Sequence, residues 1–255
     1  MTNPDDNLSP GNWVDRLAFH RPDLVFVAPM IVYLALLGLR DSVIPYEYRW
    51  AASLLRGVGG LAVVWVFRRH LPPLGKPHWL LAVVMGALIA AGWYYGQYAA
   101  NALGLPHRMP IFLFPGEFEL VDPLAKLEEL GAAAAFWPIV VCRIAVASVT
   151  VPVVEELFWR GFLLRAFIRW DDFERVPLGT FTWRSFVLTA LLSTLEHPDN
   201  WAVSIPCWFA FNALMYWKKS LLFLMLVHGL TNLFLYLWVV YQALALGNQQ
   251  AWMFW

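Results

Sequence analysis

Charged residues are scarce in this 255-residue chain, and that scarcity excludes most classes of protein. Asp, Glu, Lys and Arg make up 14% of the sequence, whereas a water-soluble domain carries about 25%. So few charges cannot cover the surface of a soluble domain. Apolar and aromatic residues reach 60%, which is far too many for a disordered chain. The composition therefore predicts an integral membrane protein with several spans.

Cysteine and net charge are lacking as well. Cys142 and Cys207 lie inside apolar runs, which favours small packing groups over a disulfide framework or a metal cluster. The 18 basic and 18 acidic residues cancel, so no basic excess is available to bind nucleic acid. We expect no nucleic-acid partner and take the lipid bilayer as the surroundings of the chain.

Long apolar runs are what the sequence does contain. A helical span needs about 20 mostly apolar residues, because backbone groups cannot stay unpaired in hydrocarbon. We expect an all-α transmembrane helical bundle of about seven to eight spans, with an N-terminal scaffold and long polar loop at residues 1–131 and a catalytic core at residues 132–255. The candidate runs are residues 24–39, 50–67, 79–99, 132–150, 152–168, 184–197, 201–217 and 221–246.

The run at residues 132–168 is too long for one straight span, and Pro152 must either bend it or end it. If it crosses the membrane once, most basic residues that flank spans fall on one side. This asymmetry fits the positive-inside rule and places the N-terminus in the cytoplasm. We therefore predict a single bent crossing in a multi-pass protein, which we expect in a prokaryotic inner (cell) membrane.

One long connection, residues 101–131, separates the scaffold from the core. Asp122 followed by Pro123 is typical of a helix start, so a short amphipathic helix is expected at residues 122–131. The remainder fits a solvated loop, or a lid that guides substrate. The acids of this connection are Glu117, Glu119, Asp122, Glu128 and Glu129.

Two adjacent carboxylates, Glu155 and Glu156, lie in an apolar run where a charged group is costly and marks a functional site. Glu156 and Arg160 are four residues apart, share a helical face and can form an ion pair. Glu155 points about 100° away and lacks this partner. The pattern favours Glu155 as a general base, although it also fits an ion pair that only holds two helices together.

Histidines follow at two later positions, His197 after Glu196 and His228 on one helical face with Asn232. Helical rise puts Glu155, His197 and His228 at depths of roughly 21, 20 and 14 Å from the same side of the membrane. We therefore expect one buried polar site near the middle of the bilayer.

The chemistry that these residues suit is hydrolysis. Glu155, aided by His197, can deprotonate a water that attacks a carbonyl carbon. His228 and Asn232 can donate hydrogen bonds to the oxyanion. The sequence contains no G-x-S-x-G and no H-E-x-x-H motif. Glu155, His197 and His228 could in principle hold zinc, but we expect no metal or other cofactor.

These residues resemble the three motifs of the CAAX protease and bacteriocin-processing (CPBP, or Abi) family, which includes the type II CAAX prenyl proteases, glutamate-dependent intramembrane endopeptidases. The motifs are Glu155-Glu156-x-x-x-Arg160, His197 and His228-x-x-x-Asn232. The resemblance covers residues 153–232. It implies that Glu155 and His197 activate the water, that His228 and Asn232 stabilise the oxyanion, and that Glu156 and Arg160 support the site.

The second motif departs from the family pattern. Ser193 stands where the family usually has an aromatic residue, four positions before the histidine. Glu196 directly before His197 is also unusual. These departures weaken the second motif and leave the first and third intact.

We therefore predict a CAAX protease-like glutamic intramembrane endopeptidase, a hydrolase that cuts a membrane-anchored or lipidated protein. Its substrate is either CAAX-like or carries a C-terminal sorting or anchor signal. The alternative is a non-enzymatic membrane immunity or scaffold protein of the same fold, against which the burial of four polar residues argues. A transporter is a third possibility, and the lack of repeat halves argues against it.

Two arginines, Arg56 and Arg143, have no role in this scheme. Arg143 lies about 18 Å along the helix from Glu155, too far for a direct pair. We expect each arginine to reach an interface or to pair with an acid on another span. Most of the 15 tryptophans, such as Trp50, Trp79 and Trp217, are expected to be interfacial anchors.

Overall fold

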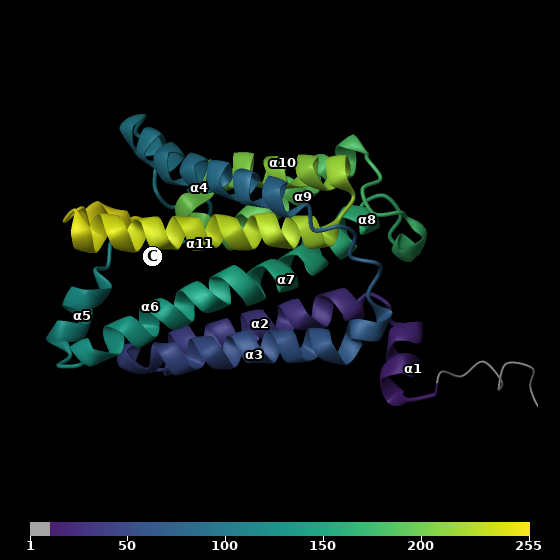
Figure 1. Ribbon diagram of the computed structural model, residues 1–255, viewed down its shortest axis with the longest axis horizontal. Coiled ribbons are helices and arrows are strands. Elements are labelled where there is room, and N and C mark those ends of the chain that lie inside the picture. Colours follow the sequence, from purple (N-terminus) through teal and green to yellow (C-terminus); the bar gives the residue numbers. More distant parts are fainter. Residues whose placement is uncertain (1–10) are drawn as a thin grey trace, which may run out of the picture.

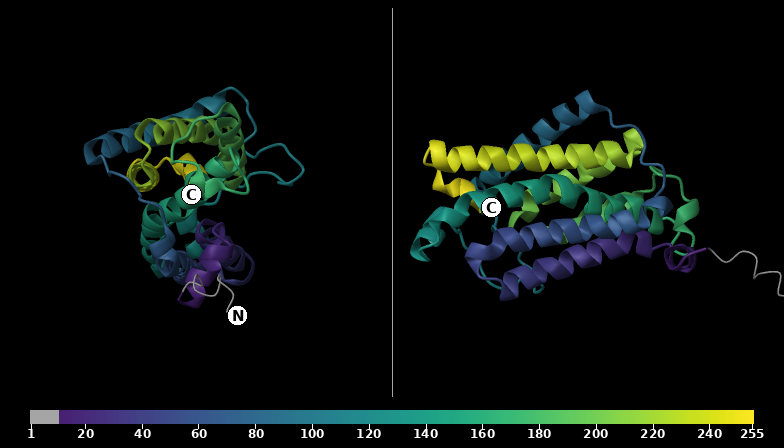
Figure 2. Two further views of the ribbon diagram at one scale, coloured as in Figure 1. Left: turned by 90° about the vertical axis from the view of Figure 1, so that its right-hand side faces the viewer. Right: turned by 60° about the horizontal axis from the view of Figure 1, so that its bottom comes forward.

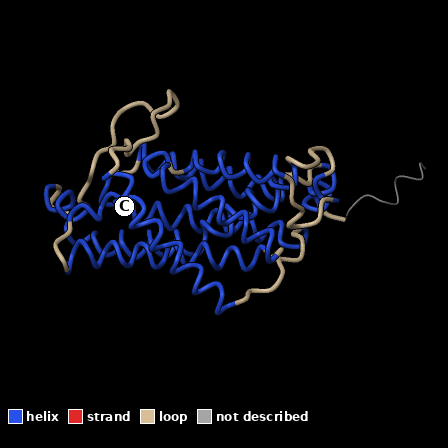
Figure 3. The backbone as a smooth tube through the Cα atoms, turned by 90° about the horizontal axis from the view of Figure 1, so that it is seen from above, coloured by secondary structure: helices blue, strands red, loops and turns tan. Residues whose placement is uncertain are grey.

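The computed structural model describes residues 11–255, and within them it contains helices and loops but no strand. The helices lie side by side in an elongated bundle (Figure 1), which confirms the expected all-α transmembrane fold. Loops gather at the two ends of the bundle (Figure 3). The N-terminus, expected in the cytoplasm, lies outside the described residues.

The elements follow one another in three groups. The first comprises α1 (Trp13–His20), α2 (Leu24–Val43), α3 (Arg49–Phe67) and α4 (Trp79–Ala102). The second comprises α5 (Pro123–Glu129), α6 (Phe136–Ala145), α7 (Val151–Glu156) and α8 (Leu164–Ala166). The third comprises α9 (Trp183–Ser193), α10 (Trp201–Lys218), α11 (Leu221–Ala245) and a final 3-10 segment, Gln249–Phe254.

The helical segment formed by α6, α7 and α8 runs through the middle of the molecule. The pair α2 and α3 packs on one side of it, and α11 packs on the other side together with α4 (Figures 1 and 2). Helices α9 and α10 pack against each other, and α10 also contacts α4 and α11. The segment that carries Glu155 is therefore enclosed from both sides.

Four helical segments are long and apolar enough to cross a membrane: Tyr46–His70, Trp79–Ala102, Ala133–Ala166 and Leu221–Ala245. The pair Trp13–His20 and Leu24–Arg40, bent by 103°, makes a fifth if it is one span. The predicted seven to eight spans also counted α9 and α10. These lie in the same bundle, but α9 has only 11 residues and α10 is less apolar.

The long run at 132–168 forms one continuous helical segment of 34 residues, Ala133–Ala166, as a single bent crossing requires. It is irregular around Pro152, where the turn Val146–Thr150 has π-helical hydrogen bonding. The Val151 N–H bonds to the Val146 carbonyl, so the Ala147 carbonyl has lost its usual donor. Pro152 has no N–H to offer to Ser148. π-Turns recur at functional sites and bend helices.

Helix α11 approaches this irregular turn closely at Gly229. A Cβ atom at that position would collide with the Ser148 carbonyl oxygen. Because Gly229 has no side chain, α11 can pass against the turn with His228 and Asn232 on either side of the contact. The close approach therefore sets the height of both residues relative to Glu155.

The connection at residues 101–131 contains the short helix that its sequence predicts. The Asp122 carboxylate accepts hydrogen bonds from the Leu124 and Ala125 N–H groups at 2.8 and 3.2 Å, which caps α5. The tryptophans divide into two sets. Trp50, Trp79 and Trp217 are exposed, as expected for interfacial anchors, whereas others such as Trp208 are buried.

Candidate active site

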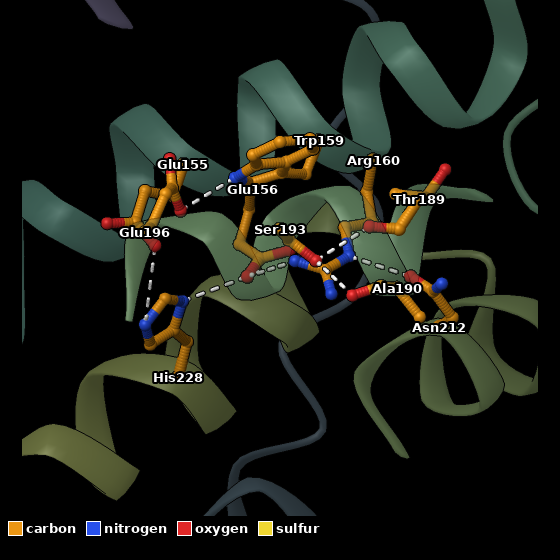
Figure 4. Close-up of polar contacts among 10 residues, drawn as sticks. All are labelled: Glu155, Glu156, Trp159, Arg160, Thr189, Ala190, Ser193, Glu196, Asn212 and His228. Carbon is orange, nitrogen blue, oxygen red and sulfur yellow. Dashed lines mark hydrogen bonds and ion pairs between the residues drawn. The ribbon is translucent and has the colours of Figure 1, made fainter. Parts of the chain in front are cut away.

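Glu156, Arg160 and His228 form a buried polar chain between the long bent helix and α11 (Figure 4). Glu156 Oε1 accepts from Arg160 Nη1 at 3.1 Å and from His228 Nδ1 at 2.9 Å. The structure thus contains the ion pair that the four-residue spacing predicts. It adds His228 as a second partner of the same oxygen, across 72 positions of sequence.

Arg160 is held from two further directions. Its Nε donates to Asn212 Oδ1 at 3.0 Å, and Asn212 in turn donates to the Phe186 carbonyl at 2.9 Å. The Trp208 ring lies 4.9 Å from the guanidinium carbon. These contacts join α9 and α10 to the helix that carries the glutamates, so the cluster fixes the relative positions of four elements.

The orientation of His228 follows from its hydrogen bond. A carboxylate paired with an arginine only accepts hydrogen bonds, so Nδ1 is the donor to Glu156. The other ring nitrogen, Nε2, then faces Glu155, whose Oε2 lies 3.9 Å away. Glu155 is 6% exposed. Glu156 therefore aims the reactive nitrogen of His228 at Glu155.

Glu196 brings a third carboxyl group into this site, and the sequence analysis noted it only as a departure from the family pattern. Trp159 Nε1 donates to Glu196 Oε2 at 2.9 Å (Figure 4). The side chains of Glu155 and Glu196 lie beside each other (Figure 4). The signal available in the sequence was an acid directly before the motif histidine.

His197 lines a cavity of about 50 Å³, which is large enough for a water molecule. The cavity is also lined by His228, Asn232 and Trp93. The His197 ring packs between Trp93 and Trp208, at centroid distances of 5.3 and 5.6 Å. Trp93 belongs to α4, within the part of the chain assigned to the scaffold, and it is a site residue that the sequence analysis missed.

The structure does not pair His197 directly with Glu155. Within residues 11–255, His197 forms no ion pair with any acid, whereas His228 contacts both glutamates of the first motif. Glu155, Glu156, Arg160 and His228 are thus joined by contacts, and His197 and Asn232 share the cavity on which His228 opens.

Asn232 is fixed by the irregular turn. Its Nδ2 donates to the Ala147 carbonyl at 2.8 Å, the carbonyl that the π-turn leaves without a donor. An amide nitrogen carries two N–H groups, so one remains for a second acceptor at the cavity. The bend in the helix therefore orients a residue of another helix.

The long loop holds the turn that follows His197. The Met109 N–H donates to the Pro198 carbonyl at 2.7 Å, and Arg108 forms a two-point ion pair with Asp199 at 2.5 and 3.1 Å. His107 Nδ1 contacts the Asp199 carbonyl at 2.5 Å, and burial lowers the pKa of this imidazole. Residues 107–109 of the loop thus hold in place the turn that directly follows His197.

Four polar atoms of the cluster have no hydrogen-bond partner in the described chain: Glu155 Oε2, Glu156 Oε2, Glu196 Oε1 and Arg160 Nη2. Buried polar atoms without partners are rare and call for an explanation. Within residues 11–255, no three His, Cys, Asp or Glu side chains are grouped so that they could hold a metal ion.

Arg56 and Arg143 contact aromatic rings instead of acids, which corrects the expected pairing with another span. The guanidinium carbon of Arg56 lies 4.7 Å from the Tyr33 ring centre, and that of Arg143 lies 4.8 Å from the Trp255 ring centre. No ion pair of either arginine is present in the described residues. Arg56 is also buried, so it does not reach an interface.

Comparison with known proteins gives one match. Residues 136–234 match the family model described as type II CAAX prenyl endopeptidase Rce1-like. The matched region contains all six residues of the three motifs: Glu155, Glu156, Arg160, His197, His228 and Asn232. No curated protein and no solved structure matches the chain.

Proposed function

Because residues 136–234 belong to the CAAX protease and bacteriocin-processing family, we propose that this integral membrane protein is a glutamate-dependent endopeptidase. It hydrolyses a peptide bond of a membrane-associated protein within or near the bilayer. The observation that carries the proposal is the convergence of Glu155, His197, His228 and Asn232 on one buried site, with Glu156 and Arg160 holding His228 in place.

The first step is the activation of water. Glu155 does not line the cavity beside His197 and His228, but its carboxylate lies 3.9 Å from His228 Nε2. A water that reaches both groups transfers a proton to Glu155 as its oxygen attacks the carbonyl carbon. His197 accepts a hydrogen bond from the same water and aligns it. No cysteine or serine nucleophile is needed in this scheme.

The second step is the stabilisation and collapse of the tetrahedral intermediate. The remaining N–H of the Asn232 amide donates to the oxyanion, and Nε2 of His228 donates as well once it carries a proton in addition to the one on Nδ1. The carbon–nitrogen bond then breaks, and Glu155 returns the proton to the leaving amine. Because Glu156 and Ala147 already fix His228 and Asn232, both donors are in place before substrate binds.

Glu196 has a positioning role in the proposal. Trp159 holds one oxygen of Glu196, which keeps this carboxyl group beside Glu155.

The substrate class follows from the position of the site inside a span. We propose a membrane-anchored or lipidated protein, either CAAX-like or with a C-terminal sorting or anchor segment. We propose the cell membrane as the location, with a cytoplasmic N-terminus, because most basic residues that flank the spans fall on one side.

The decisive experiment compares native membranes that contain the wild-type protein with membranes that contain Glu155→Gln, using mass spectrometry of new protein termini. Glutamine keeps the shape of the side chain and removes the base. A matched control is Glu129→Gln, at an exposed position of α5. We expect termini that are present with the wild type and the control and absent with Glu155→Gln.

Protein levels of all three forms are measured in the same membranes, so that loss of the protein is separated from loss of catalysis. Identical termini in all three, with the proteins equally abundant, would contradict the proposed protease. That outcome would favour the non-enzymatic immunity or scaffold function.

A further inference from the structure

A second cavity lies at the other end of the long bent helix from the glutamates. Its volume is about 480 Å³, and its walls include Arg49, Ser53, Arg143 and Trp255. These residues come from α3, α6 and the C-terminal segment, which meet at the end of the bundle where α5 lies (Figure 1). Neither the family match nor the proposed catalytic scheme gives this cavity a role.

Four arginines line the cavity: Arg40, which has an interaction elsewhere, Arg108, and the pair Arg49 and Arg143. The Arg49 guanidinium carbon lies 4.8 Å from the Tyr46 ring centre, and that of Arg143 lies 4.8 Å from the Trp255 ring centre. The rings attract the cations but supply no hydrogen-bond acceptor. Nε of each arginine is buried and has no hydrogen-bond partner within residues 11–255. Both cations therefore have donor groups free for an anion.

The other charged residues around the cavity do not supply an anionic partner for Arg49 or Arg143. Arg108 is already neutralised by Asp199. Glu117 and Glu119 lie on the loop side of the wall, and in the described part of the chain neither forms an ion pair with Arg49 or Arg143.

The start of α3 adds to the same preference. The helix begins at Arg49 without a side-chain cap, and the 3-10 turn Tyr46–Tyr48 that leads into it contains one acid, Glu47, which does not line the cavity. The positive end of its dipole faces the region of Tyr46 and Arg49, and such an end favours an anion.

We propose that this cavity binds the phosphate group of a membrane lipid head group, with Arg49 and Arg143 as the donors. The planar guanidinium group matches phosphate through paired hydrogen bonds. The cavity lies near the end of α2 and the beginnings of α3 and α6. The termini of spans lie at the level of lipid head groups. Its volume exceeds what a single anion needs and leaves room for the rest of a head group. Inorganic phosphate shares the same chemistry, so the test separates the two sources.

The test uses the purified full chain in detergent and native mass spectrometry with three probes: phosphatidylglycerol, diacylglycerol and inorganic phosphate. We expect the wild type to retain phosphatidylglycerol and not diacylglycerol. The variant Arg49→Gln/Arg143→Gln should bind phosphatidylglycerol at least tenfold more weakly. The control Arg169→Gln/Arg175→Gln, which changes two exposed arginines at the opposite end of the bundle, should match the wild type.

Two results would overturn the proposal: equal retention of phosphatidylglycerol by the wild type and the double variant, or equal retention of diacylglycerol. Tighter binding of inorganic phosphate than of the lipid would overturn the lipid source. If the double variant does not fold, Arg49→Gln alone is compared with Arg169→Gln by the same measurement. None of these residues contacts Glu155, so the proposed protease function stands or falls separately.

Discussion

The helical segment Ala133–Ala166 carries buried charge near two places, and the chain accommodates the charge differently at each. Near its C-terminal end, Arg160 is paired with Glu156 and hydrogen-bonded to Asn212. Nearer its start, Arg143 meets the rings of Trp255 and Tyr236 and no acid. The first charge is balanced inside the protein, whereas the second awaits an anion from outside. Balanced charge builds a rigid site, and unbalanced charge builds a receptor for a ligand.

The largest effect is expected at the balanced cluster. Arg160→Met leaves the Glu156 carboxylate buried with His228 as its single partner, and removal of one partner of a buried pair costs about 3–5 kcal/mol. We expect a large fall in the thermal unfolding midpoint of the detergent-solubilised protein. Arg169→Met, at an exposed ion pair, is the control and should change the midpoint little. Equal midpoints for the two variants would contradict the structural role of the pair.

A second prediction tests the contact that brings α11 to the cluster. Gly229→Ala places a methyl group against the Ser148 carbonyl oxygen, and such overpacking costs about 1–3 kcal/mol. We expect a lower unfolding midpoint together with lower proteolytic activity, because His228 and Asn232 move with α11. Gly92→Ala is the control, since a Cβ there meets no atom within 4 Å. The idea fails if both variants behave alike.

A third prediction separates the extra carboxylate from the general base. Glu196→Gln removes the carboxyl group beside Glu155 but keeps a side-chain oxygen that accepts from Trp159. We expect about a tenfold fall in kcat, corresponding to about 1.4 kcal/mol, and a changed dependence of kcat on pH, with little change in KM. Trp159→Phe should lower kcat less, because it removes only the hydrogen bond to Glu196. An unchanged pH profile in Glu196→Gln would argue that Glu196 is only structural.

The smallest effect on stability is expected at the unbalanced end. In lipid-free detergent, Arg143→Gln removes a cation that has no acid partner. The free energy of unfolding should therefore change by less than about 1 kcal/mol, and the unfolding midpoint should shift little. Added phosphatidylglycerol should then raise the wild-type midpoint and leave that of Arg143→Gln unchanged. If the unfolding midpoint of Arg143→Gln falls as far as that of Arg160→Met, the proposed difference between the surroundings of Arg143 and Arg160 is wrong.

The sequence predicted the features that depend on neighbours along one helix. The four-residue spacing predicted the pair Glu156 and Arg160, and Asp122 followed by Pro123 predicted the start of α5. Apolar run length gave the spans and the all-α fold. These features need only local geometry, which is why residue spacing was enough.

Contacts between segments that are distant in the sequence could not be predicted from residue spacing. The hydrogen bond from His228 to Glu156, the entry of Glu196 and the use of Trp93 depend on how α4, α9 and α11 pack against the bent helix. The position of Arg56 was predicted wrongly, because hydropathy patterns contain no information about which rings cover a guanidinium group.

The π-turn at Val146–Thr150 makes one part of the site separable from the rest. A π-turn takes up one residue more than an α-turn, while the helix on either side keeps its facing. Deletion of Val146 would restore regular winding, with the Val151 N–H bonded to the Ala147 carbonyl, and leave Arg143 and Glu155 on their present faces. It would, however, give the Ala147 carbonyl back to its own helix and release Asn232. One inserted residue is thus enough to recruit a side chain from a neighbouring helix, and a change of length, without any change of residue type, could add or remove that part of the site.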